Sequence, residues 1–139
     1  MNWCIFLDSN VLGYLTHPKA NSVATDCTKW LRAMLEDGAR VCLAEISDYE
    51  IRRGYIRRAA NPEAANALRK LDELKAVVEF VPIDRQMMVL AAELWADARV
   101  TGRPTAHDER LDIDVILTAQ ARVATAGCHL TIATTNIRH

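Results

Sequence analysis

The sequence predicts an α/β fold in which a parallel sheet is covered by helices on both faces. Several short apolar runs lack the polar alternation of a half-exposed strand, which indicates strands buried on both sides. Segments with the three- and four-residue spacing of amphipathic helices separate these runs, as in strand–helix–strand units. The chain has 139 residues, a length that suits one domain covering residues 1–139.

The first half of the chain contains two of the expected strands, residues 3–7 and 40–44. A short helix over 10–15 follows the first strand. A longer helix over 20–37 has apolar residues at helical spacing, and Gly38 supplies its stop. After the second strand, Ser47 begins a helix that runs through an arginine-rich segment to about residue 60.

Two capping signals begin the helices of the second half. Asn61 is expected to be an N-cap with Pro62 as the first helical residue, and this helix runs to about residue 76. Asp84 is expected to cap a long helix that runs to about residue 100. The apolar stripe expected on this long helix consists of Met88, Ala91, Ala92, Trp95 and Ala98.

The remaining elements complete the alternation. Residues 77–82 form the third expected strand, and a polar loop covers 101–110. The last helix is expected over about 112–126, where Gly127 ends it, and residues 129–133 form the fourth strand.

Composition and charge narrow the classes of function. The formal net charge is −1, so a nucleic-acid partner must be held by a local patch rather than by a global basic field. No apolar run approaches the roughly 20 residues of a membrane helix and no secretory signal is visible, so we expect no membrane partner and a cytoplasmic location. None of the four cysteines forms a C-x-x-C pair, and they are expected to be reduced core thiols.

Asp8 directly follows the first strand and is the first candidate site residue. Ligand sites of parallel α/β sheets form at the carboxyl ends of the strands, and a half-buried carboxylate there needs a counter-charge. The other interpretation is that Asp8 is the N-cap of the short helix, although Ser9 and Asn10 can also cap it. Because the preceding run is so plainly a buried strand, the functional role is favoured.

Glu50 allows two interpretations. Ser47-Asp48-Tyr49-Glu50 has the spacing of a capping box, in which Glu50 only bonds back to the backbone of Ser47. Gly54 lies one turn later on the same face, and a glycine in mid-helix costs about 1 kcal/mol relative to alanine. A bare helix surface beside an acid that must admit phosphate or metal would compensate for that cost.

Asp112 and Asp114 stand at the expected start of the last helix. One of them, Asp112 in preference, can be the N-cap, and Asp114 then projects from the first turn, where the helix dipole favours an anion. After the fourth strand, Asn136 offers a neutral oxygen ligand or a hydrogen bond to a metal-bound water.

Clustered carboxylates favour a divalent cation. Two unit charges about 4 Å apart repel by several kcal/mol at an intermediate dielectric, and a hard cation removes that cost. Oxygen ligands select Mg²⁺ or Mn²⁺ over zinc, and the four histidines show no ligand spacing. Such an ion keeps several waters and takes phosphate oxygens, which is the equipment for in-line hydrolysis of a phosphodiester.

Four motifs occur in an order typical of one family. They are Leu7-Asp8-Ser9-Asn10, Ser47-x-x-Glu50-x-x-x-Gly54, Asp114-Val115-Ile116-Leu117-Thr118-Ala119-x-Ala121 and Thr134-x-Asn136. On these motifs the chain resembles PIN domains, and among them VapC-type toxins, over about residues 4–138.

The resemblance implies a PIN-like three-layer α/β/α fold with a parallel sheet of four to five strands. It implies an endoribonuclease that depends on Mg²⁺ or Mn²⁺ and whose catalytic, metal-binding acids are Asp8, Glu50 and Asp114. Asn136 stands where many members carry a fourth acid, and the role of Asp112 is left open. For toxin members the resemblance also implies a cognate antitoxin, and often a homodimer. Two residues of the same motifs, Asn10 and Thr134, are supporting candidates.

Other functions compete with the ribonuclease. The asparagine at position 136 keeps open a non-catalytic PIN-like module that binds RNA or a protein. A haloacid-dehalogenase-like phosphatase would need a second Asp two residues after Asp8, where this chain has Asn10. Arg53 and Arg57 fall near the face of Glu50, where they contact RNA or a partner protein, pair with Glu50, or form an ordinary solvated face.

Overall fold

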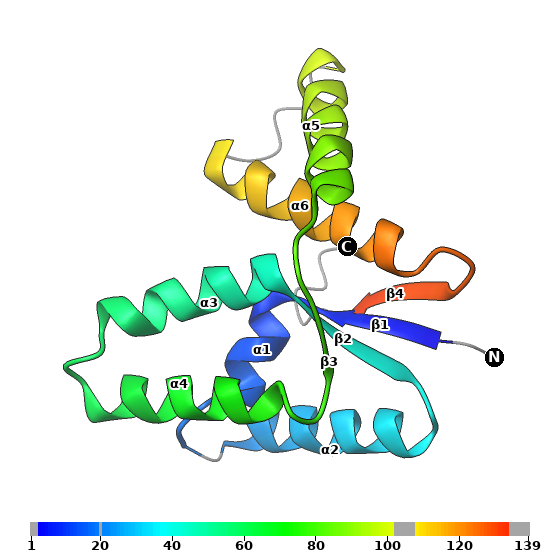
Figure 1. The fold of residues 1–139 in the computed structure, drawn as a ribbon. Coiled ribbons are helices and arrows are strands. Elements are labelled where there is room, and N and C mark those ends of the chain that lie inside the picture. The colour runs from blue at the N-terminus through cyan, green and yellow to red at the C-terminus, as the bar shows by residue number, and fades with distance from the viewer. Residues whose placement is uncertain (1–2, 20, 102–107, 134–139) are drawn as a thin grey trace.

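A four-stranded parallel sheet lies at the centre of the computed structural model, which describes residues 3–19, 21–101 and 108–133 (Figure 1). The strand order is β3-β2-β1-β4. The strands are β1 (Trp3–Leu7), β2 (Arg40–Ala44), β3 (Glu79–Val81) and β4 (His129–Ala133). The parallel α/β fold expected from the sequence is therefore confirmed, and the described residues contain no fifth strand.

Helices cover both faces of the sheet and the edge where its strands end. The helices are α1 (Ser9–Leu15), α2 (Ser22–Glu36), α3 (Glu45–Arg57), α4 (Pro62–Leu74), α5 (Arg85–Val100) and α6 (Asp108–Ala124). Figure 1 shows α1, α2 and α4 on one side of the sheet and α5 and α6 on the other, while α3 leads away from the carboxyl end of β2. Among the described residues, no helix is long and apolar enough to cross a membrane.

Two apolar cores, one on each face, explain the continuous apolar strands. Phe6 and Cys42 point to the α6 side, and their strand neighbours Leu7 and Leu43 point to the α1 and α2 side. All four side chains are fully buried. A strand with both faces in a core has no polar face to display, so its sequence shows no alternation.

Most helix boundaries follow the local signals in the sequence. Asn61 accepts a hydrogen bond from the Glu63 amide (2.9 Å), and Asp84 accepts one from the Met87 amide (2.8 Å), so both predicted N-caps are confirmed. Gly38 and Gly127 end their helices with φ values of +82° and +89°, a conformation that glycine adopts without steric cost.

The apolar stripe predicted for α5 is wrong. Its inward side chains are Met87, Leu90, Ala91 and Leu94, so Ala91 alone is shared with the predicted set, while Met88 and Trp95 are exposed. Alanines and large apolar residues occur on most sides of α5 itself, so helical spacing alone does not identify the buried face.

Two helices begin earlier than predicted. α3 starts at Glu45, directly after β2, and Ser47 is a buried residue inside the helix, so the capping box predicted for Ser47 and Glu50 is wrong. α6 starts at Asp108, so Asp112 lies inside the helix and the N-cap predicted there is wrong as well. In both cases the chain enters the helix before the residue that the local pattern marks as a cap.

A buried glutamine does the work of a cap at the start of α3. The Gln120 side chain, fully buried on α6, accepts a hydrogen bond from the Ile46 amide (3.1 Å) and donates one to the Val81 carbonyl (2.8 Å). Glu45 adds a second link, because its Oε1 accepts a hydrogen bond from the Ile83 amide (2.7 Å). The start of α3 is therefore held by α6, which satisfies the Ile46 amide, and by the β3–α5 connection, which donates to the Glu45 side chain.

Gln120→Leu is expected to lower the free energy of unfolding by roughly 2–4 kcal/mol, because it leaves the buried Ile46 amide and Val81 carbonyl without partners. Gln86→Leu, at an exposed position on α5, is the matched control and should change it by less than about 0.5 kcal/mol. Urea denaturation followed by circular dichroism measures both. Equal stability of the two variants would contradict the bridging role of Gln120.

Candidate active site

Asp8 lies at the carboxyl end of β1 and caps α1. One carboxylate oxygen, Oδ1, accepts a hydrogen bond from the Val11 amide (2.9 Å), so the capping interpretation of Asp8 is confirmed. The side chain is half-buried, and its Oδ2 receives no hydrogen bond from the described residues. Capping thus uses one oxygen and leaves the other for a ligand.

Glu50 lies on α3, one turn beyond the Ile46 amide that Gln120 holds. It is half-buried and forms no hydrogen bond or ion pair within the described part of the chain. A Cβ built at Gly54 would meet only the end of the Arg58 side chain, at 3.8 Å, so close packing does not require this glycine. The proposal that Gly54 keeps the surface beside Glu50 bare stays a prediction.

Asp114 is close enough to Glu50 for the two charges to interact. Burial raises the pKa of the Asp114 carboxyl above its usual range, Arg110 acts in the opposite direction, and the Glu50 carboxylate adds a smaller upward effect. Helix α3 packs against α6, which brings these two acids together although 64 positions separate them in the sequence. The structure thus places Asp114 within electrostatic reach of Glu50.

The reason given for Asp114 from the sequence does not hold. Because α6 starts at Asp108, Asp114 lies in the second turn of the helix rather than the first, where the dipole would have favoured its charge. Asp112 and Asn10 are exposed, on α6 and α1. Thr134 and Asn136 lie outside the described residues.

The oxygen donors of this edge have the chemistry that a hard divalent cation requires. Glu50 and Asp114 repel one another, and Mg²⁺ is commonly held by only one or two carboxylates together with waters and substrate oxygens. In the part of the chain that the structure describes, no group of three Asp, Glu, His or Cys side chains is arranged to hold a metal ion. The acids therefore fit such an ion as a pair, with Asp8 at the neighbouring strand end.

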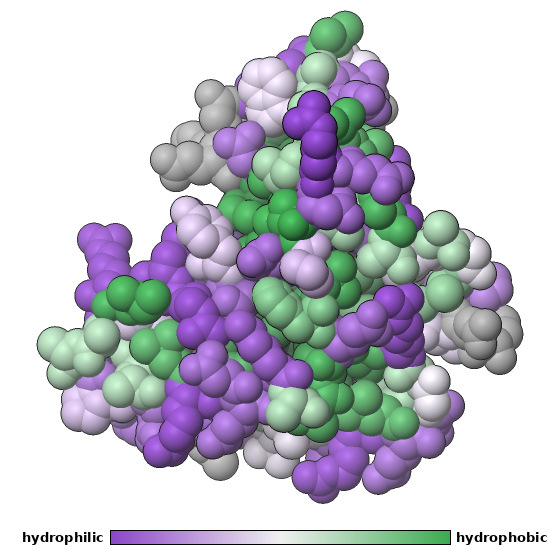
Figure 2. All heavy atoms as spheres, in the orientation of Figure 1, coloured by the Kyte–Doolittle hydropathy of each residue, from purple (hydrophilic) through white to green (hydrophobic). Residues whose placement is uncertain are grey.

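The arginines of α3 divide into two kinds. Arg53 and Arg57 are exposed, and Arg53 lies over the Tyr49 ring with its Cζ 5.2 Å from the ring centroid. Figure 2 shows hydrophilic side chains gathered over α3 and α4. Arg52 is structural, because it donates hydrogen bonds to Asp48 (2.8 Å) and Asp72 (2.8 Å).

Asp48 is a buried acid that the sequence analysis did not single out. Burial alone would raise the pKa of its carboxyl, but Arg52 and Lys75, whose Nζ lies 3.3 Å from Oδ2, outweigh it and lower the pKa below its usual range. These contacts tie α3 to α4 and to the residue that follows it. The signal in the sequence was the i, i+4 spacing of Asp48 and Arg52.

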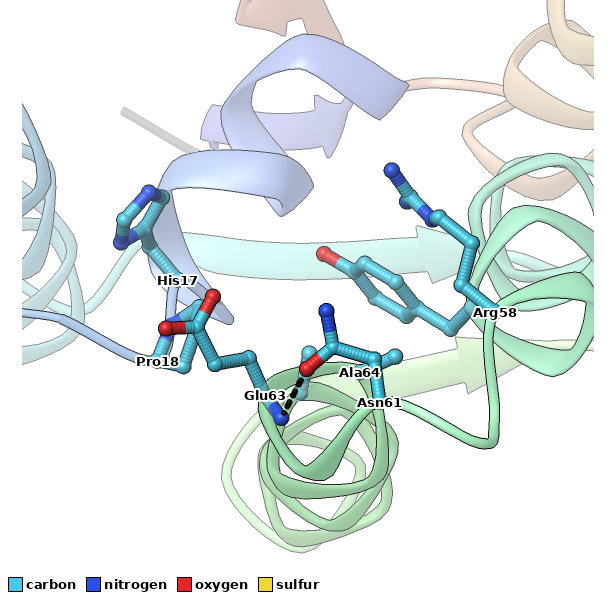
Figure 3. Close-up of a pocket in the computed structure, with 8 residues that line it drawn as sticks. His17, Pro18, Arg58, Asn61, Glu63 and Ala64 are labelled. Atoms are coloured by element: carbon cyan, nitrogen blue, oxygen red, sulfur yellow. Dashed lines mark hydrogen bonds between the residues drawn. The ribbon is translucent and has the colours of Figure 1, made fainter.

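A hollow of about 310 Å³ lies away from the acids, between the end of α1, the end of α3 and the start of α4 (Figure 3). None of the site residues predicted from the sequence lines it. Its polar side chains are already engaged: the Tyr55 hydroxyl bonds to Thr16 (2.7 Å), and Glu63 pairs with Lys19 (3.0 Å). This hollow is therefore not the candidate active site.

The fold and these acids define a parallel α/β domain with carboxylates at the carboxyl edge of its sheet. The model of the PIN domain family matches residues 5–131, and the chain belongs to this family. The family expected from the four motifs is thus confirmed. None of the curated proteins compared with the chain matches it.

Solved structures share the fold at low sequence identity. FitAcB from Neisseria gonorrhoeae is similar with a TM-score of 0.67 and 24% identity, over 95% of this chain and 87% of that chain. VapBC2 from Rickettsia felis, bound to a DNA fragment from their promoter, is similar with a TM-score of 0.64 and 14% identity, over 93% and 98%. VapBC-1 from nontypeable Haemophilus influenzae has a TM-score of 0.62 and 15% identity, over 96% and 87%.

Asp114→Asn is expected to raise the midpoint of thermal unfolding at pH 7. Folding raises the pKa of Asp114, so the wild type loses stability as pH rises through that raised pKa, and the neutral amide escapes this loss. The gain should be small, because solvent screens a partly exposed group, and it should vanish near pH 3, where the acid is protonated in both states.

Asp112→Asn, two positions away on the same helix, is the matched control for this measurement. Glu50→Gln should also stabilise, and its effect should be less than additive with that of Asp114→Asn, since each removes the same repulsion. Additive effects in differential scanning calorimetry would show that the two acids do not interact.

Proposed function

We propose that this chain is an endoribonuclease that depends on Mg²⁺ or Mn²⁺, with Asp8, Glu50 and Asp114 as its catalytic acids. The observation that carries the proposal is the Glu50–Asp114 pair at the carboxyl edge of the sheet of a PIN domain. The Glu50 and Asp114 carboxylates repel one another, and the pKa of Asp114 is raised above its usual range although Arg110 acts in the opposite direction. A perturbed acid of this kind is typical of functional sites.

The three acids have different parts in this proposal. Glu50 and Asp114 would hold the ion, and the Oδ2 of Asp8 would complete the set from the end of β1. When bound, the ion would supply an activated water and a positive charge for the scissile phosphate. Asp112, Asn10, Asn136 and Thr134 are proposed as supporting residues, and Arg53 and Arg57 as contacts for RNA or a partner.

Purified full-length protein is expected to cut single-stranded RNA when Mg²⁺ or Mn²⁺ is added and to stop when EDTA removes the ion. Glu50→Gln and Asp114→Asn should each reduce the cleavage rate at least about 100-fold, because each removes a group that stabilises the developing charge. Asp26→Asn, at an exposed position of α2, is the control and should leave the rate unchanged. Gel-resolved cleavage of end-labelled RNA measures the rates.

A second candidate function is a non-catalytic PIN-like module that binds RNA or a protein. The observation in its favour is that the described residues hold no ready three-residue metal site. Calorimetric titration with Mn²⁺ separates the two candidates. Absence of both Mn²⁺ binding and RNA cleavage would contradict the ribonuclease and favour the binding module.

We also propose that the chain is the toxin of a toxin–antitoxin pair and that a cognate antitoxin is its protein partner; we propose a homodimer as its own assembly. The support is the likeness to FitAcB and to VapBC structures, which span nearly all of this chain. The open Glu50–Asp114 pair offers a site where a cationic side chain of a partner would relieve the same repulsion as a metal ion.

If a small reading frame adjoins the gene, its product is expected to co-purify with the chain and to inhibit cleavage. Glu50→Gln/Asp114→Asn should weaken that complex, because the acids would pair with a cation of the antitoxin. Pull-down and isothermal calorimetry measure the binding. A complex that forms with unchanged affinity would remove the acids from the interface.

A further inference from the structure

A second cavity, of about 300 Å³, lies between the end of α1, one face of α2 and α4. We call it the basic cavity. Its charged lining residues are Lys19, Lys29, Arg32 and Lys70. No carboxylate lines it among the residues that the structure describes. The chain carries 17 Lys and Arg against 18 Asp and Glu, so this separation of charge is a local feature and not a reflection of composition.

Most of the positive charge in the basic cavity is uncompensated. Lys19 forms an ion pair with Glu63 (3.0 Å), which lines the hollow of Figure 3 and not the basic cavity. His17 lines both cavities. Lys70 donates to the His17 carbonyl (2.8 Å), which fixes its ammonium in the cavity without neutralising it. Lys29 and Arg32 form no hydrogen bond or ion pair with the described residues.

The shape and the remaining polar groups of the cavity suit a phosphate group. Arg32 supplies the planar donor fork that pairs with phosphate oxygens, and the Lys29 and Lys70 side chains line the same cavity. Tyr14 and Thr25 add hydroxyl groups, which donate to phosphate oxygens as readily as to carboxylates. Three like charges held together repel, and an anion would relieve that repulsion.

The basic cavity and the candidate active site lie at opposite ends of α1. Asp8 caps the start of this helix, and Tyr14 and Leu15 at its end line the cavity. Seven helical residues span about 10 Å, so a polynucleotide held at the acids reaches the cavity within a few nucleotides. A single strand of RNA carries a phosphate at every step, and so can place one in the cavity.

We infer that the basic cavity binds a backbone phosphate of the RNA strand whose cleaved bond lies at the acids. This inference rests on the proposed function. Lys29, Arg32 and Lys70 hold the phosphate, and its distance from the acids selects single strands long enough to reach both places. Because a phosphate contact carries no base information, the cavity fixes the register of the strand and not its sequence.

Binding of a fluorescein-labelled oligouridylate, measured by anisotropy in EDTA over a series of KCl concentrations, tests the inference. Lys29→Gln/Arg32→Gln is expected to weaken binding several-fold and to reduce the slope of log K against log [KCl] by about 0.7, the value for one lost phosphate contact on a single strand. Both side chains are exposed, and circular dichroism checks that the variant folds.

Arg69→Gln/Arg122→Gln is the matched control, since it removes the same charge at exposed positions outside the cavity. Arg69 is the direct neighbour of Lys70 on α4 but points in a different direction, so the control removes charge from the same helix outside the cavity. A slope unchanged in the control and reduced in the cavity variant supports the inference. Equal reductions in both variants would overturn it, because they would report net charge alone.

Two competitors test the nature of the anion. If inorganic phosphate shifts the Thr25 amide resonance while the RNA slope stays the same in the cavity variant, the cavity takes a free anion and the inference is wrong. If a polyglutamate of equal charge displaces the RNA as well as unlabelled oligouridylate does, the cavity has no preference for phosphate and the inference is also wrong.

Failure of this inference is separable from failure of the proposed function. Binding in EDTA is independent of cleavage, so a changed slope in a chain that cuts nothing would leave the basic cavity in place and remove the ribonuclease. If the chain cuts RNA and the cavity variant leaves the slope unchanged, the ribonuclease stands and the phosphate site in the basic cavity is wrong.

Discussion

The amide of Gln120 connects three parts of the chain that the candidate active site needs in one place. It joins α6 to the end of β3 through the Val81 carbonyl and to the start of α3 through the Ile46 amide. Glu50 lies one turn beyond Ile46, and Asp114 lies less than two turns before Gln120. One buried side chain therefore links the helices that carry the two acids, and its hydrogen bonds are costly to leave unmade. The acids contribute repulsion to the fold, and this bridge, with the α3–α6 packing around it, holds them together against it.

Prediction from the sequence succeeded where a local pattern has one physical meaning. The bounds of β1, β2 and β4 were predicted to the residue, and for β1 and β2 the signal was a continuous apolar run, which is typical of a strand buried on both faces. It failed where a contact from far along the chain replaced the local signal. Ser47 looks like a cap, yet α3 begins two residues earlier, where Gln120, 73 positions downstream of Ser47, accepts a hydrogen bond from the Ile46 amide. Nothing within the window of a capping motif contains that information.

In the candidate site, too, local patterns could be predicted from the sequence and long-range packing could not. Parallel strands end at one edge, so the sequence can place Asp8 and the start of α3 on the same side of the sheet. It cannot show that α3 and α6 pack closely enough for Glu50 to raise the pKa of Asp114. Asp114 was chosen for a dipole that α6 does not offer at that position, since the helix begins at Asp108. The choice had its other support in the resemblance to PIN domains, and the family is confirmed by the match over residues 5–131, while the role of Asp114 stays a prediction.

Asp8 differs from the other two acids in a way that affects how related chains can be interpreted. Because its Oδ1 caps α1, an aspartate at this position supports the helix even in a chain that has lost all chemistry. Its presence is therefore a poor diagnostic of an active enzyme, and an inactive Asp8 variant confounds lost capping with a lost ligand. Glu50 has no such structural role, because it forms no hydrogen bond or ion pair with the described residues. Under the proposed function, position 50 is therefore a better marker than position 8 for separating active nucleases from relatives that retain only the scaffold.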